Sequence, residues 1–472
     1  MGDTREDIIR MVKEEDVEFI RLQFTDILGN FKNMAVTANQ LEKILKNRCR
    51  IDGSSMEGFR ENEESELFLH PDLDTFVIFP WRPQQGKVAR LICDLYRSDE
   101  EPFEGDPRYL LKQTIAAAAR EGYAFQIGPE SEFYLFEEDE NGGPTNLTRE
   151  KGGYLDVGPL DSGENARREM VMTLEKMGYT IESSYHEASA GQHEIQFRYD
   201  LPLQTADNLM TFEMVVRTIA RRHGLYATFM PKPKNGESGS GMHINLSMYQ
   251  NGINVFSGEY SGQMAGNGLE GRDRAGSADV TDEEDRRNGF REMGISPEAG
   301  WFLAGVLSHC RGMALITNPV VNSYKRLMTG FEALRDIAWS ANTRTALLKL
   351  KADRGYSTRF ELRSPDPAAN PYLVLSLYIT AGLDGIRRRL PVPHPVSGSL
   401  RLLSEEEKES LGIDTLPTTL GEAIRAFKED RFVRGVLGEH ISNKFLEAKT
   451  QEWREYCEQV SQWELDRYLF RI

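Results

Sequence analysis

Glutamate side chains inside apolar, strand-like segments are the feature that most limits how this chain can fold. Glu130 and Glu132 lie in the segment GPESEFYLF, and Glu361 lies in RFELR, among residues whose side chains belong in a protein core. A buried carboxylate is costly unless a cation or hydrogen-bond donors compensate its charge. We therefore expect a sheet that gathers these carboxylates at one site.

Six side chains able to bind divalent cations occur in four such segments. Side chains at i and i+2 of a strand point to the same face and lie about 7 Å apart, so Glu130 and Glu132 suit two adjacent cations. Five carboxylates with one imidazole favour Mg²⁺ or Mn²⁺ over zinc, and a two-cation site is typical of phosphoryl transfer. Each residue alone would also fit a solvated surface, so the set carries the prediction. The six are Glu130, Glu132, Glu187, Glu194, His243 and Glu361.

Composition excludes several other classes of protein. The 472 residues carry a net charge of −17, from 57 basic and 74 acidic side chains, which argues against a general nucleic-acid binder. The four cysteines have no CxxC spacing, so we expect reduced thiols and neither disulfides nor a thiolate metal site. The charged N-terminus lacks the apolar core of a signal peptide, and no run of about 18 apolar residues occurs. These features predict a cytoplasmic protein with no membrane association.

The first hundred residues predict a small α+β domain, 1–103, built from short strands and one helix. The acidic, proline-containing stretch 99–107 indicates a linker. Asp106 and Pro107 at its end are typical of the first turn of a helix, which we expect to continue through Arg120. The expected strands are 17–24, 75–79 and 88–95, and the expected helix is 38–47.

The second predicted domain, 104–472, alternates the ligand-bearing strands with helices, so we expect an α+β fold with those strands side by side in a curved sheet. The polar segment 257–294 lacks apolar periodicity and predicts a mobile surface insertion, with partner binding as the alternative. The expected helices are 163–177, 205–222, 297–316 and 371–388.

Ten motifs, in this order along the chain, resemble those of bacterial and archaeal type I glutamine synthetases. The resemblance extends from about residue 15 to the C-terminus. It implies a β-grasp N-terminal domain, a catalytic domain with a curved, mainly antiparallel sheet of the guanido-kinase-like kind, and a homo-oligomer of two stacked six-membered rings with sites between subunits. The motifs are DGSSMEGF, GPESEF, GGYLD, GENARREMV, HEASAGQHE, MPKP, GSGMH, NSYKRL, GFEA and RFELR.

The resemblance also implies an activity. ATP would drive ligation of ammonia to the γ-carboxylate of L-glutamate through a γ-glutamyl phosphate, with two Mg²⁺ or Mn²⁺ ions per site. One cation would position glutamate and the amine, and the other would bind the phosphates of ATP. The first cation is assigned to Glu132, Glu187 and Glu194, and the second to Glu130, His243 and Glu361.

Further roles follow from the same resemblance. Arg359, Tyr199, Asn245 and Ser247 would border the nucleotide. Arg326 and Arg363 would bind the α-carboxylate of glutamate, because a guanidinium fork matches two oxygens at once. Gly239 would let the backbone approach the substrate.

Four residues complete the implied chemistry. Asp52, from a neighbouring subunit, would bind ammonium and accept its proton, with Ser55 beside it. Glu332 would close the site and accept a proton from the tetrahedral adduct. Arg344 would stabilise the transferring phosphoryl group.

Departures from the family pattern leave alternatives open. Ser238 stands where the family usually has asparagine, and Asn342 and Thr343 replace an arginine and an asparagine, so a γ-glutamyl ligase for another amine is the second hypothesis. A catalytically weak ring that binds a regulatory protein partner is the third. Glu61 occupies the position of a feedback arginine, which leaves glutamine inhibition open, and Arg401 occupies the position of an adenylylated tyrosine, so we expect no adenylylation.

Overall fold

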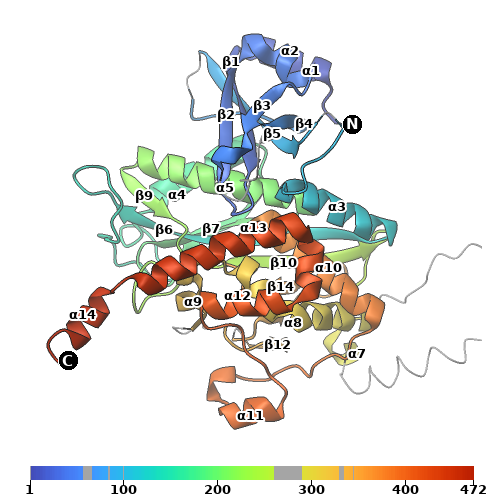
Figure 1. Ribbon diagram of the computed structural model, residues 1–472, viewed down its shortest axis with the longest axis vertical. Helices are drawn as coiled ribbons and strands as arrows, with labels where there is room; N and C mark the ends of the chain where they lie inside the picture. Colours follow the sequence, from blue (N-terminus) through green and yellow to red (C-terminus); the bar gives the residue numbers. More distant parts are fainter. Residues whose placement is uncertain are drawn as a thin grey trace, which may run out of the picture.

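Two β-sheets organise the molecule (Figure 1), which is known here from a computed structural model. The smaller sheet belongs to the N-terminal part and lies at the top of Figure 1, while the larger sheet lies in the body below it. The structure describes residues 2–56, 66–82, 85–98, 100–259, 290–328, 334–343 and 345–472.

The N-terminal sheet has five strands in the order β2-β1-β5-β4-β3. Strands β1 and β5 are parallel, and the other pairs are antiparallel. The predicted helix at 38–47 is present as a 3₁₀ turn followed by a short α-helix. The elements are α1 Arg5–Glu14, β1 Val17–Thr25, β2 Phe31–Thr37, η1 Ala38–Gln40, α2 Leu41–Leu45, β3 Cys49–Asp52, η2 Gly53–Ser55, β4 Glu66–Ile78 and β5 Lys87–Tyr96.

The larger sheet has nine strands, with the main path β12-β13-β14-β10-β6-β8-β7. Strand β9 pairs with β6 and β11 with β10, and every pair except β12–β13 is antiparallel. The expected sheet of adjacent ligand-bearing strands is confirmed. The strands are β6 Ala124–Glu137, β7 Ile181–His186, β8 Gln192–Phe197, β9 Leu225–Thr228, β10 Met242–Gln250, β11 Ile253–Asn254, β12 Trp339–Ser340, β13 Leu348–Leu350 and β14 Phe360–Leu362.

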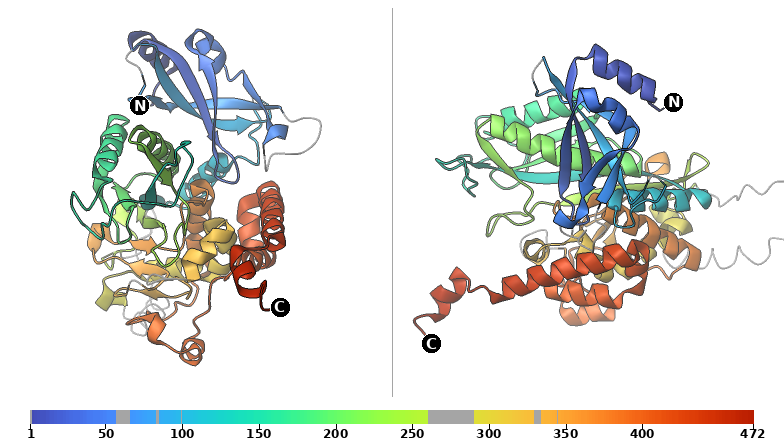
Figure 2. Two further views of the ribbon diagram at one scale, coloured as in Figure 1. Left: turned by 90° about the vertical axis from the view of Figure 1, so that its left-hand side faces the viewer. Right: turned by 45° about the horizontal axis from the view of Figure 1, so that its top comes forward.

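Helices surround this sheet, and the two views in Figure 2 show them on more than one side of it. The four helices predicted for this part are present as α4, α5, α8 and α10, and the helix after the linker as α3. The helical elements are α3 Pro107–Arg120, α4 Glu164–Lys176, α5 Pro202–Arg222, α7 Phe290–Met293, α8 Pro297–Thr317, α9 Val321–Met328, η3 Gly355–Ser357, α10 Pro371–Arg388, η4 Leu400–Leu402, α11 Glu405–Ser410, α12 Leu420–Glu429, α13 Arg431–Glu458 and α14 Gln462–Tyr468.

Proline and capping residues explain where the long helices begin. Proline occupies the first turn of α3, α5, α8 and α10, where its missing N–H costs nothing. Asp106, Ser296 and Asn370 cap three of these helices with side-chain oxygens. Within the described residues, α8 alone is long and apolar enough to cross a membrane, but 83% of its most apolar stretch is buried, as in a core helix.

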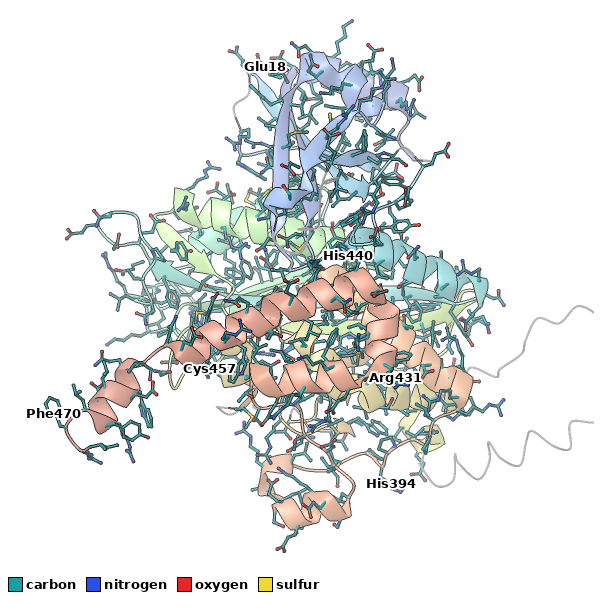
Figure 3. The ribbon with its side chains drawn as sticks, viewed as in Figure 1. Glu18, His394, Arg431, His440, Cys457 and Phe470 are labelled. Atoms are coloured by element: carbon teal, nitrogen blue, oxygen red, sulfur yellow. The ribbon has the colours of Figure 1, made fainter. Side chains whose placement is uncertain are left out.

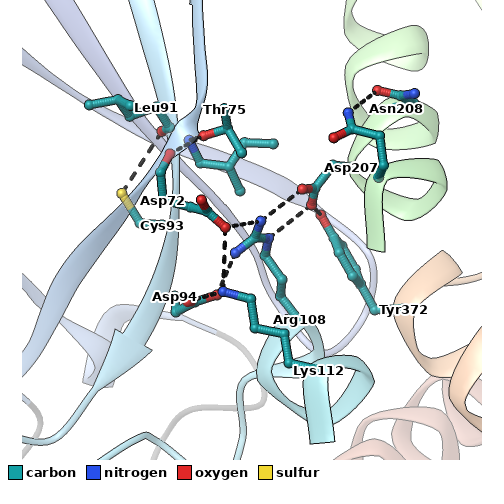
Figure 4. A network of polar contacts seen from close by, with 12 residues as sticks. Asp72, Thr75, Leu91, Cys93, Asp94, Arg108, Lys112, Asp207, Asn208 and Tyr372 are labelled. Atoms are coloured by element: carbon teal, nitrogen blue, oxygen red, sulfur yellow. Dashed lines mark hydrogen bonds and ion pairs between the residues drawn. The ribbon is translucent and has the colours of Figure 1, made fainter. Parts of the chain in front are cut away.

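A buried ionic network around Arg108 joins the N-terminal sheet to helices α3 and α5 (Figure 4). Arg108, in α3, contacts Asp94 of β5 and Asp207 of α5. Lys112, one turn further along α3, contacts Asp94 as well. The predicted linker therefore ends in a helix that holds both parts of the molecule together.

The predicted insertion 257–294 is only partly described, because residues 260–289 lie outside the described part of the chain. Its ends belong to the folded body. Phe290 is fully buried, and the backbone N–H of Gly258 donates to the carbonyl of Gly294 at 2.9 Å. The boundaries predicted for a surface insertion were therefore too wide, since they included a core phenylalanine.

Helix α13 leads away from the body to α14 and the C-terminal residues (Figure 3). Phe470, labelled at the end of this arm, is 93% exposed. Its neighbours Trp463, Leu469 and Ile472 are also exposed. The cysteines are unpaired, with three buried and Cys457 exposed, as the spacing predicted.

Candidate active site

Strands β14, β10, β6 and β8 lie side by side and carry five of the six predicted cation ligands. Their register sets the pairs: His243 of β10 lies opposite Glu130 of β6, and Glu194 of β8 lies opposite Glu132 of β6. Because Glu130 and Glu132 are two residues apart, they face the same side and begin two adjacent clusters.

The first cluster consists of Glu130, His243 and Glu361, whose ligand atoms lie within 4.8 Å of one another. His243 Nδ1 lies 3.5 Å from Glu130 Oε2 and 3.7 Å from Glu361 Oε1. Burial alone would raise the pKa of Glu130, but hydrogen bonding and charge from His243, aided by Lys351, lower it to about 2. This carboxylate is therefore ionised and available to a cation at neutral pH.

Lys351 also reaches this cluster, although the sequence did not single it out. Its Nζ lies 3.0 Å from Glu361 Oε2 and 3.6 Å from Glu130 Oε1. The alternating Leu-Lys-Leu-Lys stretch 348–351 predicts that Lys351, directly after β13, lies on a polar face, but it does not show which carboxylates lie opposite. Lys351 brings a positive charge to the side of the site where the resemblance places phosphates.

The second cluster consists of Glu132, Glu187 and Glu194, again with ligand atoms within 4.8 Å. The backbone N–H of Gly241 donates to Glu132 Oε2 at 2.6 Å. Burial and the charge of Glu130, in the adjacent cluster, raise the pKa of Glu194. A divalent cation would relieve that repulsion.

Two side chains missed in the sequence orient Glu194. The hydroxyl of Tyr185 and the amide of Gln196 both donate to Glu194 Oε1, at 2.8 and 2.6 Å. Gln196 also donates to the Tyr185 hydroxyl at 3.0 Å. Hard oxygen donors in this number, with one imidazole across both clusters, fit divalent Mg²⁺ or Mn²⁺.

The predicted glutamate-binding arginines lie beside the clusters. Arg363 Nε is 3.1 Å from Glu361 Oε1. Arg326 is buried and donates to the carbonyls of Ser364 and Arg363 at 2.8 and 3.0 Å. A Cβ on Gly239 would lie 2.8 Å from Arg326 Cγ, so glycine permits this close approach.

The predicted nucleotide residues gather at the other end. The Arg359 guanidinium lies over the Tyr199 ring, 5.5 Å from its centroid. Asn245 donates to Glu130 Oε1 at 2.9 Å, so it also supports the first cluster. Ser247 is buried, and its hydroxyl donates to the carbonyl of Thr358 at 3.1 Å.

The remaining predicted residues lie apart from the two clusters or outside the part of the chain that the structure describes. Asp52 is exposed at the end of β3, in the N-terminal sheet, and its Oδ1 accepts hydrogen bonds from the N–H and hydroxyl of Ser54. Glu332, Arg344 and the Ser55 side chain lie outside the described residues.

A sheet that carries two adjacent carboxylate clusters with flanking arginines is typical of enzymes that bind divalent cations and transfer phosphoryl groups. Family models agree with this class. The model described as the glutamine synthetase catalytic domain matches residues 104–268 and 282–468, and the one described as the glutamine synthetase beta-Grasp domain matches residues 16–98.

Individual relatives give the same result. A glutamine synthetase of Clostridium saccharobutylicum is 51% identical over 466 residues, which cover 99% of this chain and 98% of the relative. One from Staphylococcus aureus strain Mu50 is 48% identical over 467 residues, again 99% and 98% of the two chains. The chain belongs to the glutamine synthetase family. It is a glutamate–ammonia ligase, which makes glutamine from glutamate and ammonia with ATP and a divalent metal.

Solved structures share the fold. A GmaS–ADP complex matches with a TM-score of 0.82 and 29% identity, covering 99% of this chain and 100% of that chain. The cryo-EM structure of Plasmodium falciparum glutamine synthetase matches with a TM-score of 0.82 over 99% of both chains. At 22% identity it bears on the fold alone.

Proposed function

We propose that the two clusters bind two Mg²⁺ or Mn²⁺ ions, with Glu130, His243 and Glu361 on the ATP side and Glu132, Glu187 and Glu194 on the glutamate side. When bound, these cations would screen the negative charge of the reacting oxygens. The observation that supports this assignment most strongly is the i, i+2 pair Glu130 and Glu132, which begins both clusters on one strand.

Residues beside the two clusters bind and orient glutamate. Arg326 and Arg363 bind the α-carboxylate of glutamate, with the Gly239 backbone alongside. The γ-carboxylate then attacks the γ-phosphorus of ATP, which yields ADP and γ-glutamyl phosphate. Ammonia displaces inorganic phosphate from that intermediate to give glutamine.

The nucleotide is held at the opposite end of the site. Arg359 and Tyr199 bind it together with Asn245 and Ser247, and Arg359 is already placed over the Tyr199 ring. Lys351 adds a cation near the phosphates, since it contacts both carboxylates of the first cluster. Arg344 stabilises the transferring phosphoryl group.

Proton transfer completes the cycle. Asp52 of a neighbouring subunit, with Ser55, binds ammonium and accepts a proton from it. Glu332 accepts a proton from the tetrahedral adduct and closes the site, which excludes water from the acyl phosphate.

Two glutamine variants test the metal assignment. Glu361→Gln should weaken Mn²⁺ binding that depends on ATP, and Glu194→Gln should weaken Mn²⁺ binding in the absence of ATP, because each removes one anionic ligand from a different cluster. Glu175→Gln, on the exposed face of α4, is the matched control. The assignment fails for any cluster whose variant binds Mn²⁺ and turns over at the level of the control while circular dichroism is unchanged.

We further propose a type I assembly of two stacked hexameric rings in the cytoplasm, without adenylylation and without nucleic-acid or membrane binding. Each subunit would contain an N-terminal domain, 1–103, and a catalytic domain, 104–472. The exposed apolar side chains of the C-terminal arm support an oligomer, because burial against another copy would remove them from water. The exposed position of Asp52 supports a site completed by a neighbour.

Subunit mixing tests this assembly. Inactive Asp52→Ala and inactive Glu361→Ala proteins, dissociated and reassembled together, should regain activity at interfaces that combine one intact half from each. Separately reassembled single variants are the control. Verified mixed rings with no recovered activity would place the whole site within one subunit.

A γ-glutamyl ligase for another amine is the second candidate function. Ser238, which stands where the family usually has asparagine, favours its consideration. The backbone of Ser238 is held on both sides, by the Ser189 hydroxyl at 2.8 Å and by the Tyr134 hydroxyl at 2.6 Å. A change of side chain at this position would therefore alter the pocket without moving the loop.

A further inference from the structure

Behind the second cluster lies a separate group of four buried side chains that the reaction does not use. Their ligand atoms also lie within 4.8 Å of one another, and all four residues are at most 8% exposed. Two of them are the histidines next in sequence to Glu187 and Glu194. The four are Glu150, Asp161, His186 and His193.

Glu150 is the centre of the first half of this group. Its Oε1 accepts hydrogen bonds from His186 Nε2 at 2.7 Å and from the backbone N–H of Gly191. Its Oε2 accepts from the N–H and the hydroxyl of Ser162, both at 2.9 Å. One carboxylate thus joins three segments: the loop before α4, the end of β7, and the turn between β7 and β8.

The His186 ring connects Glu150 to the backbone of Glu187. Its Nδ1 donates to the backbone carbonyl of Glu187 at 2.6 Å, so both ring nitrogens face oxygen acceptors. The turn itself is closed by the Glu187 N–H, which donates to the carbonyl of Gln192 at 2.8 Å. Glu150 therefore holds the loop 187–191 by hydrogen bonds at both ends, through His186 and through Gly191.

The second half of the group holds strand β8. Arg167 of α4 donates to His193 Nδ1 at 2.8 Å, and its other nitrogen lies 2.8 Å from Asp161 Oδ2. His193 precedes Glu194 directly. The backbone on each side of the second cluster is thus tied to the loop 150–163 and to α4.

A bound cation is not needed to explain these contacts. The Arg167 guanidinium lies between Asp161 and His193, where a metal would have to sit to reach both. The Glu150 carboxylate already accepts four hydrogen bonds. The two acids therefore have protein donors in place of a metal.

We propose that Glu150 is a positioning residue for the reaction: through His186 and Gly191 it fixes the loop 187–191, and so holds Glu187 where the second cluster binds its cation. The inference rests on the proposed metal role of Glu132, Glu187 and Glu194. A carboxylate outside the second cluster then controls metal affinity on the glutamate side, while metal affinity on the ATP side is unaffected.

The test uses the assembled enzyme with Mn²⁺ as the probe, titrated without nucleotide and followed by electron paramagnetic resonance of free Mn²⁺. Glu150→Gln replaces one acceptor oxygen by a donor, so it must lose at least one of the four hydrogen bonds. We expect Mn²⁺ affinity at one class of site to fall by about 10- to 100-fold, with the other class unchanged. The KM for ATP should stay near the wild-type value while kcat falls.

Two variants separate positioning from general damage. Glu150→Asp keeps the carboxylate and should recover part of the lost affinity, and Ser162→Ala, which removes one donor alone, should lose less than Glu150→Gln. Glu175→Gln, with an exposed carboxylate on α4, should behave as wild type. If Glu150→Gln does not fold, the Mn²⁺ affinities of Glu150→Asp and Ser162→Ala test the proposal instead. Both should lie between those of the wild type and Glu194→Gln, and wild-type affinity in both would refute the positioning role.

Several outcomes would overturn the inference. Unchanged Mn²⁺ affinity in Glu150→Gln, together with a loss in Glu194→Gln, leaves the metal assignment standing and refutes the positioning role. Unchanged affinity in Glu194→Gln refutes the metal assignment itself. A metal ion that survives dialysis against a chelator, and that is lost in Glu150→Gln but kept in Glu194→Gln, would make the buried group a metal site instead.

Discussion

Arg108 of α3 and Asp207 of α5 form two parallel hydrogen bonds inside the molecule, from Nε to Oδ1 at 2.9 Å and from Nη2 to Oδ2 at 2.8 Å (Figure 4). The same guanidinium donates to Asp94 of β5 at 2.6 Å and to Asp72 of β4 at 2.8 Å. Because β4 and β5 belong to the N-terminal sheet, one arginine fixes that sheet against the helices of the larger one. It thereby sets where Asp52 is presented.

Arg108→Met should destabilise the protein by about 3–5 kcal/mol, because it leaves Asp207 buried without its cation and Asp94 with Lys112 alone. Chemical unfolding at one fixed protein concentration measures this loss. Arg10→Met, which breaks the exposed pair with Asp7, is the matched control and should change stability little, because solvent screens the pair. A loss in Arg108→Met no larger than that in the control would show that the network contributes little to stability.

Helices with proline in the first turn and a long apolar run could be predicted from the sequence, as α8 and α10 illustrate. Helix α1 could not, because its ten residues bury only Ile8 and Val12 and the rest are mostly charged. Its remaining signal was the capping box of Thr4 and Asp7. Ile8, Met11 and Val12 also have helical spacing, but three apolar residues in one short, highly charged segment are a weak signal.

The candidate site could be predicted from the sequence where its residues lie on a single strand. The spacing of Glu130 and Glu132 indicated two adjacent cation sites, and the family resemblance assigned the other four ligands to them. Lys351 and Tyr185 were missed because their contacts depend on the pairing of β13 with β14 and of β7 with β8. Register between strands far apart in sequence is set by the whole sheet, and no local pattern contains it.

Asp430 gives a pH-dependent test of the helix packing around α13. It caps α13 and accepts from the N–H groups of Phe432 and Val433, and His309 Nδ1 lies 3.2 Å from its Oδ2. Burial alone would raise its pKa, but the hydrogen bond and charge of His309 and the two N–H groups lower it. The ionised form therefore stabilises the fold above the pKa of the unfolded carboxyl, about 4, and this contribution is lost as pH falls through the lower folded pKa.

Asp430→Asn keeps the cap and removes the charge, so it should cost about 1–3 kcal/mol near pH 6 and progressively less below about pH 4. The thermal midpoint, measured at one protein concentration across this range, follows the change. Asp414→Asn, at an exposed carboxylate paired with Arg311, is the control and should change little at any pH. The argument would be contradicted by a midpoint difference that stays constant as the pH falls from 6 to well below 4.

Gly239→Ala tests the close approach at the substrate loop. The new Cβ would lie 2.5 Å from the carbonyl oxygen of Pro231 and 2.8 Å from Arg326 Cγ, so the loop or Arg326 must move. We expect the KM for glutamate to rise about tenfold or more, and the KM for ATP to stay unchanged, since Arg326 is a proposed ligand of the glutamate α-carboxylate. Gly435→Ala, in α13 with no atom within 4 Å of its new Cβ, is the control and should leave both constants unchanged.

Amine specificity is the last prediction, and Ser238 is the reason to test it. With ATP, Mg²⁺ and glutamate, ammonium should stimulate phosphate release more than methylamine, ethanolamine or putrescine, and glutamine should form in equal amount. The expectation follows from family membership. The fixed backbone at Ser238 limits any difference from the family to the side chain itself. Product mass identifies the amine that was joined, and Ser238→Asn serves as the matched variant, expected to keep the same order of amines. Preference for a larger amine would favour the second candidate function, whereas no stimulation by any amine would favour a ring that binds a regulatory partner.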